Sequence, residues 1–146
     1  MAKVLIVDDE PQVREILNRH VTDAGHETCQ AGNTEEALAA IKDFAADVAL
    51  CDVQMPGAHD GIWLTNQLRR TYPHTAVVLC TSVSDVPPAT SMQAGVVAYV
   101  VKPFNRKGLL DALEVGVKWH NESVTAGPAT SAASDALEAW FAALDN

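Results

Sequence analysis

The sequence predicts an α/β fold, in which a doubly wound, five-stranded parallel sheet is covered by helices on both faces. Short apolar runs alternate with segments whose apolar residues recur at helical spacing. Five such pairs follow one another, an alternation typical of parallel strands joined by crossover helices. The strand-like runs are almost wholly apolar, as expected of strands that are covered on both faces. The strands are expected at residues 3–7, 26–31, 47–52, 76–81 and 98–101.

Several helices carry start or stop signals in the sequence. Pro11 can occupy the first turn of the first helix, and Gly25 ends it. Asn33 and Glu36 form a capping-box pattern for the second helix. The fourth helix, over residues 87–94, buries little apolar area and is the weakest of the five.

The chain divides into a domain, a linker and a short tail. Residues 1–122 hold the five strand and helix pairs, whereas residues 123–134 are small and polar, as in a flexible linker. Residues 135–146 are expected to form a short amphipathic helix. A helix of this length is not stable alone in water. Three roles for its apolar stripe stay open: docking on its own domain, binding another chain such as a second copy, or beginning a truncated output domain. The stripe comprises Leu137, Trp140, Phe141 and Leu144.

Composition excludes several classes of protein. The formal net charge of −9 over 146 residues argues against a nucleic-acid surface, which needs clustered Lys and Arg. No apolar run approaches the roughly 20 residues of a membrane span, and the N-terminus does not resemble a signal peptide. We therefore expect a cytoplasmic protein that contacts neither nucleic acid nor membrane.

The three cysteines are expected to be free thiols. Cys29, Cys51 and Cys80 lie in strand-like apolar runs without the spacing of metal ligands. Cys51 and Cys80 each come one residue before the polar end of a strand. They are therefore expected to face each other across neighbouring strands.

Charged and polar residues follow the ends of the predicted strands. Asp8 and Asp9 end the first strand, Asp52 the third, Thr81 the fourth and Lys102 the fifth. In doubly wound sheets these strand ends meet at one edge, where ligands bind. Three carboxylates repel one another unless a cation lies among them, and Mg²⁺ suits such oxygen ligands.

The alternative is that each acid merely caps the helix that follows it. That accounts for Asp60. It accounts poorly for Asp8, Asp9 and Asp52 together, because they coincide with Lys102.

Four segments contain the polar residues at these strand ends. They are Val4-Leu5-Ile6-Val7-Asp8-Asp9-Glu10, Asp52-Val53-Gln54-Met55-Pro56-Gly57, Thr81-Ser82 and Lys102-Pro103-Phe104. Together they resemble the signature of the receiver domains of two-component response regulators, including those of the chemotaxis type. The resemblance covers residues 3–121 in order and spacing, and it implies a flavodoxin-like strand order of 2-1-3-4-5.

The resemblance also implies the roles of the metal ligands. Asp52 would be the phosphoacceptor, and Asp9 and Asp52 would bind Mg²⁺ directly. Asp8 would contribute through water, and Gln54 through its backbone carbonyl.

The remaining roles concern the phosphoryl group and the response to it. Lys102 would pair with the phosphoryl group, and Thr81 would donate its hydroxyl to a phosphoryl oxygen. Tyr99 matches the aromatic switch position of the family, although a tyrosine there could instead reach toward solvent. Movement of Thr81 would open space for Tyr99 and so change the surface.

The implied partners are a sensor histidine kinase or phosphotransfer protein, and a downstream effector protein or output domain. A homodimer also stays open. Such a receiver phosphorylates and dephosphorylates itself but is not an enzyme acting on other substrates.

Three other classes of protein fit the sequence less well. A hydrolase of the aspartyl-phosphate type often has an acid where Gln54 stands, a nucleotide-binding module needs a glycine-rich phosphate loop after the first strand, and a receiver without phosphorylation would not need the intact acids.

Two features depart from the family pattern. The loop over residues 55–61 is one residue longer than usual, and its His59 is expected to be an ordinary surface residue. Trp63 stands where the family has a polar residue. Either the longer loop folds over it or it marks a contact surface.

Overall fold

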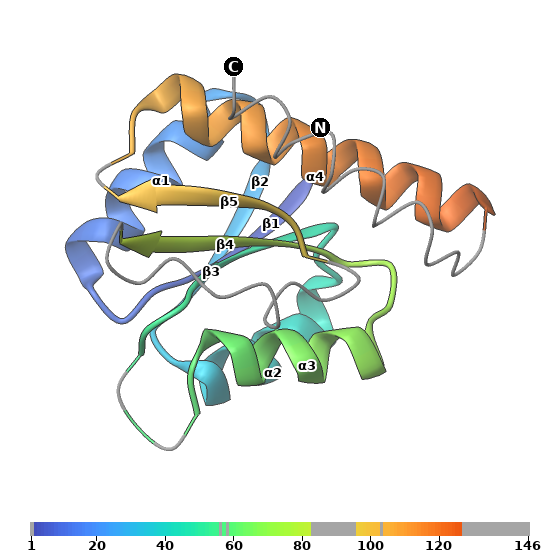
Figure 1. Ribbon diagram of the computed structural model, residues 1–146, viewed down its shortest axis with the longest axis horizontal. Coiled ribbons are helices and arrows are strands. Elements are labelled where there is room, and N and C mark those ends of the chain that lie inside the picture. The colour runs from blue at the N-terminus through green and yellow to red at the C-terminus, as the bar shows by residue number, and fades with distance from the viewer. Residues whose placement is uncertain (1, 56, 58, 83–95, 103, 127–146) are drawn as a thin grey trace.

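The computed structural model describes residues 2–55, 57, 59–82, 96–102 and 104–126. Its centre is a five-stranded parallel sheet in the order β2-β1-β3-β4-β5 (Figure 1). The predicted fold class and strand order are therefore confirmed. The strands are β1 (Lys3–Val7), β2 (Glu27–Ala31), β3 (Val48–Asp52), β4 (Ala76–Ser82) and β5 (Val96–Lys102).

Helices cover both faces of the sheet. In Figure 1, α1 and α4 lie on one face, and α2 and α3 lie on the other. The helices predicted at residues 87–94 and 135–146 fall outside the described residues. The described helices are α1 (Pro11–Asp23), α2 (Thr34–Phe44), α3 (Gly61–Thr71) and α4 (Arg106–Ala126).

The sheet separates two apolar cores. On one side, Leu17 of α1 and Leu113 of α4 pack against Val4 and Val78 of the strands. On the other side, helices α2 and α3 bury Ala37, Ile41, Leu64 and Leu68. Burial of apolar surface on both faces explains why the strands lack alternation between polar and apolar residues.

The predicted capping box of α2 is present in a modified form. Asn33 Oδ1 accepts a hydrogen bond from the Glu36 amide at 2.8 Å. Glu36 Oε1 in turn accepts from the amide of Gly32 at 2.7 Å, one residue before the cap. The first bond satisfies an amide that the first turn of the helix leaves unpaired, and the second ties the residue before the cap to that turn.

Helix α4 continues further than the sequence predicts. It ends at Ala126, so the first four residues of the predicted linker are helical. In this extension, Ser123 Oγ lies 2.7 Å from His74 Nδ1. About one turn earlier, the His120 ring lies 2.6 Å from the carbonyl of His74 and 3.2 Å from Asp47. Small, polar composition predicted a linker here because these distant partners cannot be read from local sequence.

The three cysteines are free thiols, as predicted, but Cys51 and Cys80 do not face each other. The register pairs Cys51 with Leu79 and Asp52 with Cys80. Paired residues in a parallel sheet point to the same face, and successive residues alternate. Cys51 and Cys80 therefore belong to opposite cores. The prediction was wrong because the strand ends are offset by one residue.

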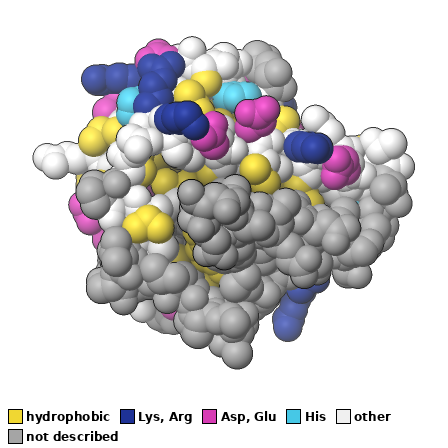
Figure 2. All heavy atoms as spheres, turned by 45° about the horizontal axis from the view of Figure 1, so that its top comes forward, with side chains coloured by type: hydrophobic (Ala, Val, Ile, Leu, Met, Phe, Trp, Pro, Cys, Tyr) yellow, Lys and Arg dark blue, Asp and Glu magenta, His cyan; other side chains and the backbone are white. Residues whose placement is uncertain are grey.

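Charged side chains of both signs lie along the upper part of the face drawn in Figure 2, where the described side chains are coloured. There, acidic and basic side chains lie next to one another, with apolar side chains between them. Within the described part of the chain, no helix combines the length and apolar composition needed to cross a bilayer.

Candidate functional site

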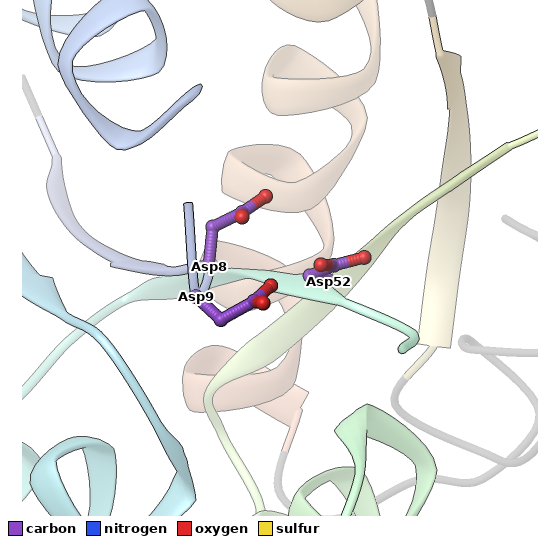
Figure 3. Close-up of side chains that lie close together, drawn as sticks. All are labelled: Asp8, Asp9 and Asp52. Atoms are coloured by element: carbon purple, nitrogen blue, oxygen red, sulfur yellow. The ribbon is translucent and has the colours of Figure 1, made fainter. Parts of the chain in front are cut away.

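Three carboxylates meet at the carboxyl edge of the sheet. Asp8 and Asp9 directly follow β1, and Asp52 is the last residue of β3 (Figure 3). One carboxylate oxygen from each lies within 4.8 Å of the others. Asp8 and Asp52 are buried and Asp9 is partly exposed. The structure therefore brings together the acids that the sequence predicts at this edge.

Lys102, at the end of β5, lies among these acids. Its Nζ is 3.1 Å from Asp8 Oδ2 and 3.4 Å from Asp52 Oδ1. Burial works against the charged amine, but the hydrogen bond to Asp8 and the charges of both carboxylates outweigh it, so the pKa of Lys102 is raised. Lys102 is therefore a fixed cation within reach of any group attached to Asp52.

Asp52 is held in an environment that disfavours its charge. Burial, followed by repulsion from the Asp8 carboxylate, raises the pKa of Asp52 to about 6. Lys102 and the amide of Gln54 oppose this shift without cancelling it. The site thus contains more negative charge than one lysine neutralises, a condition that favours a bound cation.

This imbalance predicts how Asp52→Asn changes stability with pH. The folded-state pKa of Asp52, about 6, exceeds the unfolded value of about 3.9, so the folded chain binds more protons between these values. Below pH 4, where the Asp52 carboxyl is protonated in both states, it does not destabilise the fold. As pH rises through 6 the carboxyl ionises in the folded protein, and the free energy of unfolding falls. Asp52→Asn is expected to stabilise the metal-free protein by about 2–3 kcal/mol at pH 8 and little near pH 4.

Urea denaturation at both pH values in the presence of a chelator measures this difference. An equal effect of Asp52→Asn at pH 4 and pH 8 would show that Asp52 does not carry the destabilising charge.

The end of β3 is packed tightly against the start of α3. The Gly61 amide donates to the carbonyl of Val53 at 2.9 Å. A Cβ at Gly61 would lie only 2.0 Å from the backbone oxygen of Asp52. Asp60 caps α3 by accepting from the Trp63 amide at 3.0 Å, as the capping alternative predicts for this acid. Sequence reasoning placed the helix start correctly but gave no sign that residue 61 must be glycine.

The two predicted switch residues point to the same face of the sheet. Thr81 and Tyr99 are both buried, at 1% and 6% exposure. Tyr99 pairs with Leu79, and Thr81 lies two residues beyond Leu79 on the same strand. Tyr99 belongs to the core beneath α2 and α3, so the alternative in which it reaches toward solvent does not describe this structure.

His59, in the segment that follows β3, lies against Trp63 of α3. The His59 ring stacks on the indole with centroids 3.7 Å apart and planes inclined by 12°. Trp63 also packs against the core beneath α2 and α3. Of the two alternatives for Trp63, this stacking favours the one in which the loop covers it. His59 itself is partly exposed, and its assignment as a surface residue stays a prediction.

The residues present fit a Mg²⁺ ion. All three acids offer carboxylate oxygens, the ligands that hard divalent cations prefer, and the partly exposed Asp9 leaves access for the waters that Mg²⁺ retains. Gln54 is exposed, and its amide lies 3.4 Å from Asp52 Oδ1. The predicted contribution of the Gln54 carbonyl stays a prediction.

The fold and the site together define a class of protein. A doubly wound sheet whose carboxyl edge gathers three aspartates, a lysine and a buried threonine is a phosphoacceptor module. Residues 4–114 match the model of the response regulator receiver domain, and the chain belongs to that family. It is thus a receiver domain of two-component response regulators, which accept a phosphoryl group on an aspartate and regulate output domains. Such domains bind Mg²⁺ at their acidic pocket.

Curated relatives agree with this assignment. The response regulator protein FleR of Pseudomonas aeruginosa is 39% identical over 111 residues, which are 75% of this chain and 23% of FleR. The DNA-binding transcriptional regulator NtrC of Salmonella typhimurium is 33% identical over 120 residues, 82% of this chain and 25% of NtrC. AruR of Pseudomonas aeruginosa is 31% identical and aligns over 89% of this chain and 55% of its own length. The chain thus spans between a quarter and about half of these relatives.

Solved structures support the same fold. The response regulator TrrA of Thermotoga maritima, in complex with Mg²⁺-BeF, has a TM-score of 0.72 and 31% identity, over 80% of this chain and 99% of TrrA. The receiver domain of NtrX from Brucella abortus has a TM-score of 0.74 and 28% identity, over 79% of this chain and 98% of that domain.

Proposed function

We propose that Asp52 is the residue that accepts the phosphoryl group, from a sensor histidine kinase or a phosphotransfer protein. The observation that carries this assignment is the position of Lys102, whose Nζ lies 3.1 Å from Asp8 and 3.4 Å from Asp52. A cation at that place can neutralise charge on a group attached to Asp52 while remaining paired with Asp8. Asp52 ends β3, the middle strand of the sheet, whereas Asp8 and Asp9 follow the neighbouring strand β1.

In the proposed reaction, a carboxylate oxygen of Asp52 attacks phosphorus in line with the leaving nitrogen of a phosphohistidine. The new O–P bond forms as the P–N bond breaks, and the released imidazole retains the electron pair of that bond. Asp9 and Asp52 are the proposed direct ligands of Mg²⁺, with Asp8 acting through water and Gln54 through its carbonyl. When bound, Mg²⁺ neutralises charge on the phosphoryl oxygens.

Thr81 and Tyr99 are proposed to convert phosphorylation into a change of surface shape. The product carries about −1.5 to −2 charge and three acceptor oxygens, which draw the Lys102 amine and the Thr81 hydroxyl toward them. Because Thr81 and Tyr99 share a face, displacement of Thr81 frees space into which the Tyr99 ring can turn. The edge of the sheet near β4 and β5 would then present a different surface to an effector or output domain.

The proposed partners of this chain are therefore proteins. NtrC is named as DNA-binding, but the similarity covers only 25% of its length, and the net charge of −9 disfavours contact of this chain with nucleic acid. Apart from its own phosphorylation and dephosphorylation, we propose no enzymatic activity for the chain, and we retain a cytoplasmic location as a prediction from sequence.

Labelling with acetyl phosphate and Mg²⁺ tests the proposed function. The intact mass is expected to rise by one phosphoryl group, and peptide mapping after borohydride trapping is expected to place it on Asp52. Tryptophan fluorescence is expected to change when beryllofluoride and Mg²⁺ are added together, but not with either alone. Phosphorus on another residue, or labelling that persists in excess chelator, would reject the assignment.

A further inference from the structure

Arg14 lies in the first turn of α1, where a cation does not benefit the helix. The positive end of the helix dipole disfavours a basic residue there. Residue Glu10 occupies the N-cap position but makes no side-chain cap bond, and the first turn contains no acid. Arg14 therefore has no evident role in stabilising its own helix.

The guanidinium instead reaches back to the acidic site. Arg14 Nη1 donates to the backbone carbonyl of Asp8 at 2.6 Å. The backbone amide of Asp8 donates to the carbonyl of Ala31 at the end of β2, at 3.2 Å. Asp8 is thus held through its backbone on two sides, and the Asp8 side chain is 0% exposed.

These bonds fix the two peptide groups that flank Asp9. The carbonyl of Asp8 belongs to the peptide before Asp9, and it is held by Arg14. The amide of Glu10 belongs to the peptide after Asp9, and it donates to Asp8 Oδ1 at 2.9 Å. With both flanking peptides fixed, the backbone of Asp9 has little freedom, so the Cα–Cβ bond that carries its carboxylate keeps one direction.

The guanidinium of Arg14 occupies space that a side chain at position 32 would fill. A Cβ at Gly32 would lie 3.1 Å from Arg14 Nη1 and 3.2 Å from Glu36 Oε1. Absence of a side chain at Gly32 therefore lets the guanidinium lie between α1 and the start of α2.

We propose that Arg14 is a positioning residue for the magnesium site, which directs the Asp9 carboxylate by holding the carbonyl of Asp8. This inference rests on the proposed function, because it concerns the same metal site. A positioning role and a purely electrostatic role predict opposite changes in Mg²⁺ affinity when Arg14 is removed. The charge of Arg14 repels Mg²⁺, so its removal would tighten binding if charge alone mattered. If position matters, removal weakens binding because Asp9 is no longer held in place.

Calorimetric titration of the whole chain with Mg²⁺, without a phosphodonor, separates the two roles. Arg14→Ala is expected to raise the dissociation constant about tenfold, at the lower end of losses caused by removing an outer partner of a metal ligand. Arg19→Ala is the matched control, because it removes the same charge from an exposed position of the same helix. It is expected to leave the dissociation constant unchanged.

A second measurement requires no metal. In the metal-free protein, the Glu10 amide is expected to exchange with solvent faster in Arg14→Ala than in Arg19→Ala, because Asp8 is then less firmly held. Unchanged or tighter Mg²⁺ binding by Arg14→Ala, or equal changes in the two variants, would overturn the inference while the proposed function stands. A wild-type chain that binds no Mg²⁺ would overturn both.

Discussion

Asp52→Asn is expected to reduce labelling by acetyl phosphate to background. The amide of asparagine has no ionised oxygen to attack phosphorus, so the covalent step is lost and not merely slowed. The variant should remain folded. The pKa of the Asp52 carboxyl is raised to about 6, so at neutral pH its charge destabilises the folded state, and the substitution removes that charge. Intact-mass spectrometry after incubation with acetyl phosphate and Mg²⁺ measures the loss.

Lys107→Ala serves as a control for this experiment. Lys107 pairs with Asp111 on the exposed surface of α4, and its side chain is 86% exposed. Labelling of this variant should equal that of the wild type. Full labelling of Asp52→Asn, mapped to Asp8 or Asp9, would show that a neighbouring acid is the acceptor and would remove the basis of the assigned roles.

The lifetime of the label on the wild-type chain, and not its loss in Asp52→Asn, separates the receiver from a hydrolase of the aspartyl-phosphate type. Those enzymes often need a second acid two residues after the nucleophile, and Gln54 stands at that position here. Gln54 is exposed and cannot donate or accept a proton as a carboxyl group does. An acyl phosphate on Asp52 should therefore persist as a signal instead of being passed rapidly to water.

The architecture of the site was predictable because it follows from strand topology. Once five parallel strands are recognised, the ends of β1, β3 and β5 must lie along one edge, and their polar residues come together. Asp8, Asp52 and Lys102 needed no knowledge of side-chain contacts to be placed there. Lys102 lies on β5, which β4 separates from β3, so the distances of 3.1 and 3.4 Å from its Nζ to Asp8 and Asp52 depend on its long side chain reaching across β4.

Features that depend on register or distant packing were not predictable in this way. A one-residue offset between β3 and β4 decides that Cys51 and Cys80 lie on opposite faces. The contact of Ser123 with His74 joins residues 49 positions apart, and it extends α4 into a segment whose composition indicates a linker. The hydrogen bond from the Arg14 guanidinium to the Asp8 carbonyl depends on the conformation of the Arg14 side chain. The spacing of apolar residues along the sequence does not specify that conformation.

Gly61→Ala is expected to destabilise the protein by about 3 kcal/mol or more, the largest stability effect that the described site predicts. The added Cβ would lie 2.0 Å from the oxygen of Asp52, 2.9 Å from its carbonyl carbon and 3.0 Å from the Cα of Val53. All three are backbone atoms, so no side-chain rotation relieves the overlap. Either α3 moves away from the sheet, or the end of β3 is displaced and takes Asp52 with it.

Urea denaturation measures the loss of stability, and Gly108→Ala is the matched control. Gly108 also lies in the first turn of a helix, but the nearest atom to its added Cβ is the side-chain oxygen of Asn105, at 3.2 Å. Since alanine favours helices over glycine by about 1 kcal/mol, Gly108→Ala should be neutral or slightly stabilising.

Labelling of Gly61→Ala in conditions where it remains folded distinguishes the two ways of relieving the overlap. If the end of β3 moves, Asp52 shifts relative to Lys102, and labelling slows more than the loss of folded protein explains. If α3 moves instead, labelling per folded molecule stays near that of the wild type. Equal stability of Gly61→Ala and the wild type would contradict the close approach of α3 to β3, which fixes the backbone of Asp52.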